Sequence, residues 1–270
     1  MIKQIKKILK LILPIKIFKF IKILYLSFSF KSLNYLSYDK NFDLVENEKL
    51  LEQISLDKNY ILNIFKDNKL NFNDDLLSWH YHIFAGLSKN SKDLNILEIG
   101  THIGSFTHYI SKIFNSSKIF TVDLHHEDKL FKSAKYNRNI FQEREKFLKK
   151  RDLNLKKSNI KFFEMNSFDL LNNFEKEFFD IIWLDGDHTN PQLSMDLISS
   201  FYLLKKGGIL LTDDIFFKKN SKNVSNFETL NAIKYLTDLK KCKTYYFSKR
   251  INRRNAFAKK FISFSIKNHV

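Results

Sequence analysis

Short apolar runs alternate with amphipathic stretches over most of the chain after residue 90. Runs of five or six mostly apolar residues are typical of buried strands, and apolar residues three or four positions apart between the runs indicate helices. Strands that alternate with helices form a parallel sheet with helices on both faces, and right-handed crossovers make it doubly wound. The predicted fold class is therefore α/β. The predicted strands are 95–99, 118–123, 160–164, 180–185 and 208–213, and the predicted helices between them are 105–114, 137–150 and 192–204.

The two ends of the chain differ from this central pattern. Residues 243–248 and 256–264 both have strand character, and the connector between them is too short for a helix, so we predict an antiparallel pair at the sheet edge. Residues 59–69 and 74–88, ahead of the first strand, have helical patterns. The predicted organisation is a basic amphipathic segment at 1–31, a helical lead-in at 32–89 and an α/β domain at 90–270.

The first 31 residues are apolar with a stripe of lysines. They contain no acidic residue, and the longest uncharged stretch, Ile23 to Phe30, is far shorter than the roughly 20 residues that span a bilayer. The pattern is typical of an amphipathic helix that lies in a membrane interface with its lysines toward anionic headgroups. A helix that packs its apolar face on the domain or on a second subunit has the same pattern, so both interpretations stay open. A signal peptide is disfavoured, because lysines interrupt the apolar run and no small-residue cleavage site follows.

The composition excludes several classes of protein. The 270 residues carry a formal net charge of +17, and 44% of them are hydrophobic, so the chain is not a disordered basic tail. The single cysteine, Cys242, rules out an intramolecular disulfide framework and a cysteine-based zinc site, which fits a reducing compartment. Abundant Lys, Asn, Ile and Phe suggest an AT-rich coding sequence, so the charge alone is a weak argument for a nucleic-acid partner.

The turn after the first predicted strand is the most informative motif. It has the form E-x-G-x-x-x-G, with Glu98 near the strand end and Gly100 and Gly104 before the next helix. Glycines let the backbone approach a ligand, and the start of the following helix offers free N–H groups. A dinucleotide site would have G-x-G-x-x-G, but residue 102 is His, and the G-K-[ST] sequence of a P-loop is absent.

This turn resembles the first motif of class I S-adenosylmethionine-dependent methyltransferases, whose fold is Rossmann-like. The resemblance implies that Glu98 contacts the methionine part of the cofactor and that the glycines line its path. It also implies that Asp123 holds both ribose hydroxyls, for which a carboxylate is suited because it can accept two hydrogen bonds. The implied cofactor residues are Glu98, Gly100, Thr101, Gly104, Ser105, Asp123, Asn166, Ser167 and Asp185, with Asn166 and Ser167 bordering the adenine.

Acidic residues mark the ends of the fourth and fifth predicted strands, which meet at one edge of a parallel sheet. Carboxylates gathered there need a cation or a network to hold them, and oxygen ligands without cysteine suit Mg²⁺, Mn²⁺ or Ca²⁺. The arrangement is similar to that of metal-dependent O-methyltransferases acting on catechols and sugars. That similarity implies a divalent metal on Asp185, Asp213 and Asp214, and His188 as general base. A simple turn-anchoring role for Asp214, without metal, stays open.

The implied function is methyl transfer from S-adenosylmethionine to a hydroxyl of a small molecule or sugar, including glycan- or lipid-linked sugars. Mg²⁺ or another divalent cation is expected to assist, with Asp185 and His188 as catalytic residues. A nucleic-acid methyltransferase is a disfavoured alternative, because no RNA-binding module is recognisable, and a membrane-associated binding protein without activity is another. We expect a cytoplasmic location, or a peripheral one at the inner face of the cell membrane, and leave a homo-oligomer open. Trp79 is expected to pack in the core, beside His80 and His82.

Overall fold

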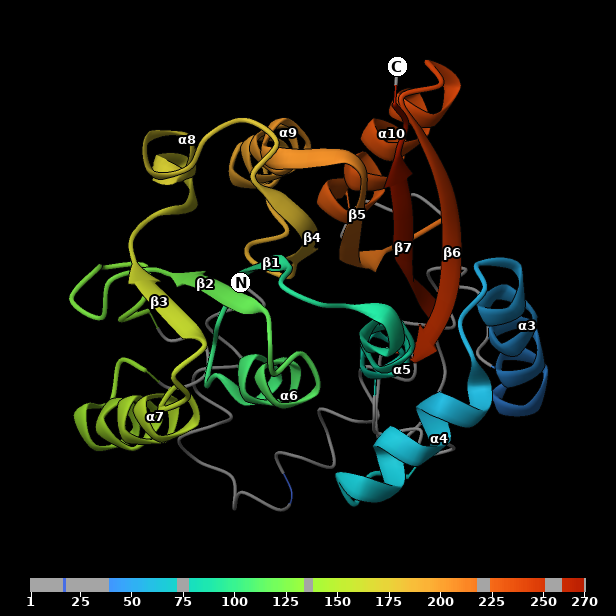
Figure 1. Cartoon of the computed structure of the whole chain (residues 1–270). Coiled ribbons are helices and arrows are strands. Elements are labelled where there is room, and N and C mark those ends of the chain that lie inside the picture. Colours follow the sequence, from blue (N-terminus) through green and yellow to red (C-terminus); the bar gives the residue numbers. More distant parts are fainter. Residues whose placement is uncertain are drawn as a thin grey trace.

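A twisted seven-stranded sheet with helices on both faces forms the centre of the molecule (Figure 1). The computed structural model describes residues 17, 39–71, 78–133, 138–217, 224–250 and 259–269, without the side chains of 224–227 and 250. The strands are β1 (Asn95–Ile99), β2 (Lys118–Asp123), β3 (Ile160–Glu164), β4 (Phe179–Leu184), β5 (Leu204–Ile215), β6 (Cys242–Arg250) and β7 (Lys259–Lys267).

The strand order is β3-β2-β1-β4-β5-β7-β6. The first five strands are parallel, and the order of strands reverses where β1 lies between β2 and β4. Such a switch point is where open α/β sheets bind ligands. β7 runs antiparallel to both β5 and β6. The predicted α/β fold, mostly parallel with an antiparallel C-terminal edge pair, is therefore confirmed.

Three of the described helices differ from the sequence-based expectation. α8 and α10 are absent from the predicted helices, and α3 has 14 residues where the polar stretch 32–57 suggests only one or two helical turns. The buried residues of α3, four positions apart, are Asp43, Asn47 and Leu51, so this helix has almost no apolar stripe from which to predict it. The described helices are α3 (Lys40–Gln53), α4 (Lys58–Asp67), α5 (His80–Leu87), α6 (Ser105–Ile113), α7 (Phe141–Asn154), α8 (Leu170–Asn173), α9 (Gln192–Leu203) and α10 (Val224–Asp238).

The polar residues of α3 attach it to the sheet edge. The Asn47 side chain donates to the Ser248 carbonyl at 2.9 Å and accepts from the Ser248 N–H at 2.8 Å, as a neighbouring strand would. Asp43, 1% exposed, forms an ion pair with Lys259 of β7 at 2.5 Å. These contacts cover part of the edge strand β6, whose backbone groups would otherwise be free to pair with another chain.

The lead-in helices and the sheet share one hydrophobic core. Trp79 and Phe84 of the α5 region pack in the same buried cluster as Trp183 of β4. Trp79 is 6% exposed, which confirms the expectation that it packs in the core, and His80 and His82 are buried beside it. The boundary predicted at residue 90 therefore marks no break in the packing.

The predicted amphipathic segment 1–31 lies outside the described residues, apart from the exposed Ile17. Its membrane attachment stays a prediction. Among the helices that the structure describes, none has the length and apolar character needed to cross a bilayer.

Candidate active site

The turn between β1 and α6 depends on two glycines in the left-handed region. Gly100 has a φ of 104°, and a Cβ atom there would lie 2.3 Å from the carbonyl oxygen of Asp185. Gly104, with a φ of 69°, is the N-cap residue of α6 and leaves the first N–H groups of that helix without a side-chain cap. The ends of β1 and β4 can approach this closely only because residue 100 has no side chain.

Beneath this turn lies a buried network of one carboxyl group and three hydroxyl groups. Glu98 is 2% exposed, and its Oε2 accepts hydrogen bonds from Thr107 Oγ1 at 2.5 Å and Thr121 Oγ1 at 2.6 Å. Thr101 Oγ1 lies 2.6 Å from Thr121 Oγ1. Burial raises the pKa of Glu98 to about 8, although the two hydroxyl hydrogen bonds oppose that shift. Glu98 and Thr101 thus support the turn from below, and their direct contact with a cofactor stays a prediction.

The predicted ribose-binding acid lies at the end of β2, beside the glycine turn. Asp123 is half-buried, with Oδ2 accepting from the His102 N–H at 2.8 Å and Oδ1 accepting from the Leu124 N–H at 2.8 Å. Burial raises its pKa, against the effect of these backbone hydrogen bonds. Ser105 is exposed as the first residue of α6. The structure therefore brings Asp123, Gly100 and Ser105 to one end of the sheet, and their contact with a cofactor stays a prediction.

The residues predicted to border the adenine, Asn166 and Ser167, lie beside a buried acid, Asp196, that no local sequence pattern marks. Asn166 Oδ1 accepts from the Phe168 N–H at 3.0 Å, and Ser167 donates to Asp196 Oδ1 at 2.6 Å. Gln192 also donates to that Asp196 oxygen, at 2.9 Å. Asp196 is 1% exposed, and burial raises its pKa to about 6. A polar residue within a helix usually faces solvent, so nothing in the local pattern marked Asp196.

The aspartates after β4 and β5 meet two lysines of the β6–β7 hairpin. We call Asp185, Asp213, Asp214, Lys249 and Lys260 the acid–lysine cluster. Lys249 Nζ contacts both carboxylate oxygens of Asp213 and lies 3.5 Å from Asp214 Oδ1. Lys260 Nζ contacts the same Asp214 oxygen. Both lysine side chains are largely buried, at 10% and 14% exposed.

These contacts shift the pKa values of the neighbouring Asp213 and Asp185 in opposite directions. Burial alone would raise the pKa of Asp213, but the Lys249 and Lys260 ammonium groups hold that pKa well below its usual range. At Asp185, desolvation and repulsion from Asp213 raise the pKa. His188 Nε2 lies 3.5 Å from Asp185 Oδ1 and 3.7 Å from Asp214 Oδ2. The two predicted catalytic residues, His188 and Asp185, are thus brought together.

The three aspartates do not fit the metal site that the sequence suggested. Ammonium groups contact two of them directly, which supplies the positive charge that the prediction had assigned to a metal. Among the described residues, only His125, His126 and Glu164 place ligand atoms of three side chains within 4.8 Å of one another. That group lies at the ends of β2 and β3, and its Glu164 already forms an ion pair with Arg151 at 2.5 Å.

Comparison with known proteins agrees with this geometry. Residues 97–215, which include the glycine turn, Asp123 and all three aspartates, match a family model described as a methyltransferase domain. Over this segment the chain is similar to methyltransferase domains. The resemblance to S-adenosylmethionine-dependent methyltransferases inferred from the sequence is thereby confirmed.

Solved structures are similar to this chain at low sequence identity. The cofactor-bound protein Rv0187 from MTB is 13% identical, covers 78% of this chain and 88% of its own, and has a TM-score of 0.51. An O-methyltransferase from Bacillus cereus in complex with SAH is 15% identical, with 83% and 97% covered and a TM-score of 0.48. A precorrin-6y C5,15-methyltransferase from Geobacter metallireducens is 15% identical, with 68% and 86% covered and a TM-score of 0.42. No match was found among curated proteins.

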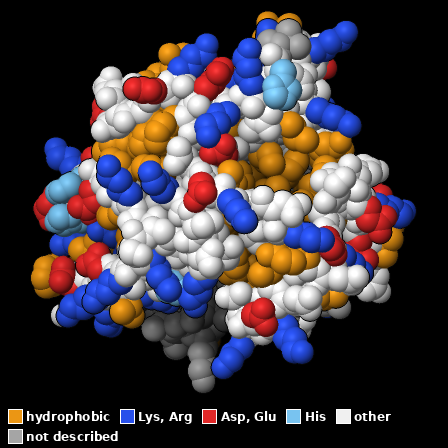
Figure 2. All heavy atoms as spheres, viewed as in Figure 1, with side chains coloured by type: hydrophobic (Ala, Val, Ile, Leu, Met, Phe, Trp, Pro, Cys, Tyr) orange, Lys and Arg blue, Asp and Glu red, His pale blue; other side chains and the backbone are white. Residues whose placement is uncertain are grey.

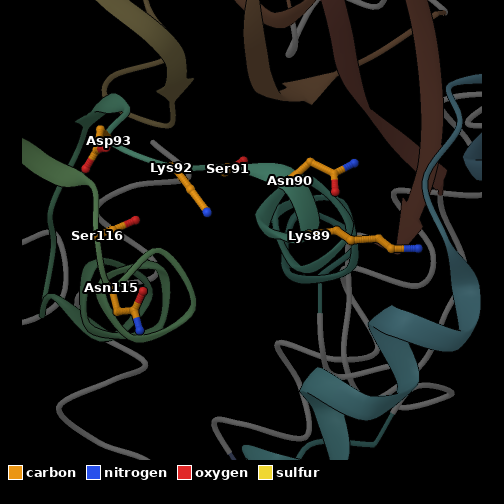
Figure 3. Close-up of a pocket in the computed structure, with 7 residues that line it drawn as sticks. All are labelled: Lys89, Asn90, Ser91, Lys92, Asp93, Asn115 and Ser116. Atoms are coloured by element: carbon orange, nitrogen blue, oxygen red, sulfur yellow. The ribbon is translucent and has the colours of Figure 1, made fainter.

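A polar pocket lies at the opposite end of β1 from the candidate active site. It is lined by residues 89–93, just ahead of β1, and by Asn115 and Ser116, just after α6 (Figure 3). The Lys92 side chain points into the space between α5 and α6, whereas Lys89 points away from it and forms an ion pair with Asp57 at 2.5 Å. None of the predicted site residues lines this pocket, so it is separate from the candidate active site.

Proposed function

We propose that this chain transfers the methyl group of S-adenosylmethionine to a hydroxyl oxygen of a small molecule or sugar. The observation that carries the proposal is His188, which lies against two carboxylates at the carboxyl ends of β4 and β5, in a methyltransferase domain. A basic side chain at that edge is suited to take a proton from an acceptor hydroxyl.

The cofactor would occupy the crevice at the switch point of the sheet. Its methionine part would lie along Gly100 and Gly104, with Ser105 at the start of α6. Asp123 would bind the ribose hydroxyls, since each of its oxygens accepts one backbone hydrogen bond and retains a further lone pair. The proposed cofactor-binding residues are Glu98, Gly100, Thr101, Gly104, Ser105, Asp123, Asn166, Ser167 and Asp185.

The carboxylates around His188 suggest which ring nitrogen acts as the base. Asp185 and Asp214 both face Nε2, so that nitrogen is placed to carry a proton, and Nδ1 is left to accept one. As the acceptor oxygen bonds to the methyl carbon, the carbon–sulfur bond of the cofactor breaks and the hydroxyl proton passes to Nδ1. The products are the methyl ether and S-adenosylhomocysteine. No metal enters this proposal, because ammonium groups contact the expected ligands Asp213 and Asp214.

A labelled-methyl transfer assay tests the proposal. The full chain is incubated with S-adenosylmethionine labelled in its methyl group, and hydroxylated sugars, a catechol and RNA are offered as separate acceptors. Label in a sugar or catechol supports the proposal, and label in RNA alone contradicts it. Cofactor binding without transfer to any acceptor favours the alternative of a binding protein without activity.

The variant H188A gives a sharper test of the assigned base. We expect its kcat to fall by about 10²- to 10³-fold, the usual contribution of a general base, while the Kd for the cofactor changes by less than about threefold. His269, an exposed histidine just after β7, is the matched control, and H269A should keep wild-type turnover. Full activity in H188A would remove this residue from the mechanism.

A further inference from the structure

We infer that Lys249 and Lys260 replace a divalent cation in the acid–lysine cluster, so that methyl transfer at this site requires no metal. The link to catalysis rests on the proposed function, but the exclusion of a metal from these carboxylates does not. Lysine ammonium groups already contact Asp213 and Asp214, two of the three expected ligands.

Strand register brings the two lysines together. Lys249 of β6 and Lys260 of β7 are direct cross-strand partners in the antiparallel pair. Like charges directly opposite one another in a sheet are destabilising unless other groups compensate them. The compensation comes from Asp213 and Asp214, which lie in β5 where its pairing with β7 shifts register between Thr212 and Ile215. A pair of lysines on the hairpin thus matches a pair of aspartates on β5.

The contacts leave these carboxylates poorly suited to Mg²⁺ or Mn²⁺. Such ions take oxygen ligands at short range in a near-octahedral set. Both oxygens of Asp213 already accept from Lys249, and Asp214 Oδ1 accepts from Lys260. A divalent ion on the same oxygens would lie beside two largely buried ammonium groups and be repelled by them.

The lysines act on the candidate base through Asp214. Its Oδ1 contacts the ammonium groups, while its Oδ2 lies 3.7 Å from His188 Nε2. The lysines therefore hold the Asp214 side chain in place beside the imidazole. They are positioning residues rather than groups that contact the reacting atoms.

Mn²⁺ binding to the full chain tests the inference without knowledge of the acceptor. Calorimetric titrations are made in an H125A/H126A background, which removes the separate His125–His126–Glu164 group. We expect no Mn²⁺ binding that depends on Asp213. One bound Mn²⁺ that disappears in D213N would overturn the inference. If no acceptor is ever methylated, the proposed function fails, yet this titration still gives its answer.

Single lysine variants test the exclusion directly and avoid removing both charges at once. K249Q, which removes the ammonium group from both oxygens of Asp213, should gain Mn²⁺ binding that D213N abolishes. Failure of folded K249Q to gain it would contradict the idea that ammonium groups keep the ion out. In turnover assays, EDTA should leave the wild type within twofold of its rate. K260Q should lose about tenfold in kcat, as for the loss of a supporting contact, whereas K260R should recover most of it. A wild type inactivated by EDTA and restored by Mg²⁺ would also overturn the inference.

Discussion

Glu98 near the end of β1 and Asp213 near the end of β5 both have buried carboxyl groups, but their partners differ in charge. Under the glycine turn, Glu98 meets hydroxyl groups, and its pKa rises to about 8. At the end of β5, Asp213 meets ammonium groups, and its pKa falls well below its usual range. The two residues are 2% and 6% exposed, so burial does not separate them. The charge of the partner does.

Because of this difference, the charge of Glu98 depends on pH near neutrality and the charge of Asp213 does not. A carboxyl group that is buried with neutral donors changes its charge near neutral pH, whereas one paired with ammonium groups stays ionised. On the proposed cofactor side Glu98 therefore changes its charge near neutral pH, whereas on the proposed acceptor side Asp213 stays ionised. On the face shown in Figure 2, Lys and Arg are scattered among acidic and polar side chains.

The largest expected loss of stability comes from removing the Lys249 ammonium group beside Asp213. K249M leaves Asp213 buried without its closest partner, so we expect a loss of about 3–5 kcal/mol in the free energy of unfolding. Urea denaturation at pH 7 measures it. The double variant D213N/K249M should recover most of the loss, because neither charge remains. A K249M protein within about 1 kcal/mol of wild type would show that the pair is not effectively buried.

A smaller loss of stability is expected at Gly100, where the ends of β1 and β4 approach each other. G100A places a Cβ atom 2.3 Å from the Asp185 carbonyl oxygen at a φ of 104°, so we expect a loss of about 3 kcal/mol from the clash and backbone strain. Thermal unfolding and cofactor titration measure it. Gly186 is the matched control, since a Cβ there would meet its nearest atom at 3.4 Å. If G100A and G186A unfold alike, the close approach of β1 and β4 is not needed.

The smallest expected effect is the pH dependence of stability that Glu98 contributes. Because the pKa of folded Glu98 is about 8, above its ordinary value of 4.5, the folded state holds this proton more tightly than the unfolded state. Its contribution to stability is full below pH 4.5 and is lost as the pH rises through 8. Between pH 6 and 8 the wild type should lose about 2 kcal/mol more than E98Q.

Urea denaturation across that range measures the difference between wild type and E98Q. The exposed Glu143 of α7 is the matched control, and E143Q should follow the wild-type curve. Parallel curves for wild type and E98Q would show that Glu98 is ionised throughout, which would remove the contrast with Asp213.

Local patterns predicted the elements that depend on local contacts. The five parallel strands follow from apolar runs, and the C-terminal pair follows from its short connector. Gly100 and Gly104 were identifiable because few other residues tolerate their backbone conformation. α3 was underestimated because its buried face carries Asp43 and Asn47, whose partners Lys259 and Ser248 are some 200 residues away in the chain.

The sequence by itself determined the fold class, the glycine turn and the positions of the acids at the carboxyl ends of the strands. Only the tertiary structure decided what those acids face. Lys249 and Lys260 lie 36 and 46 residues after the aspartates that they contact, and the register of the β6–β7 hairpin on β5 brings them together. Carboxylates gathered at one sheet edge require positive charge, but nothing local distinguishes a metal ion from a lysine, because either satisfies the same electrostatic need.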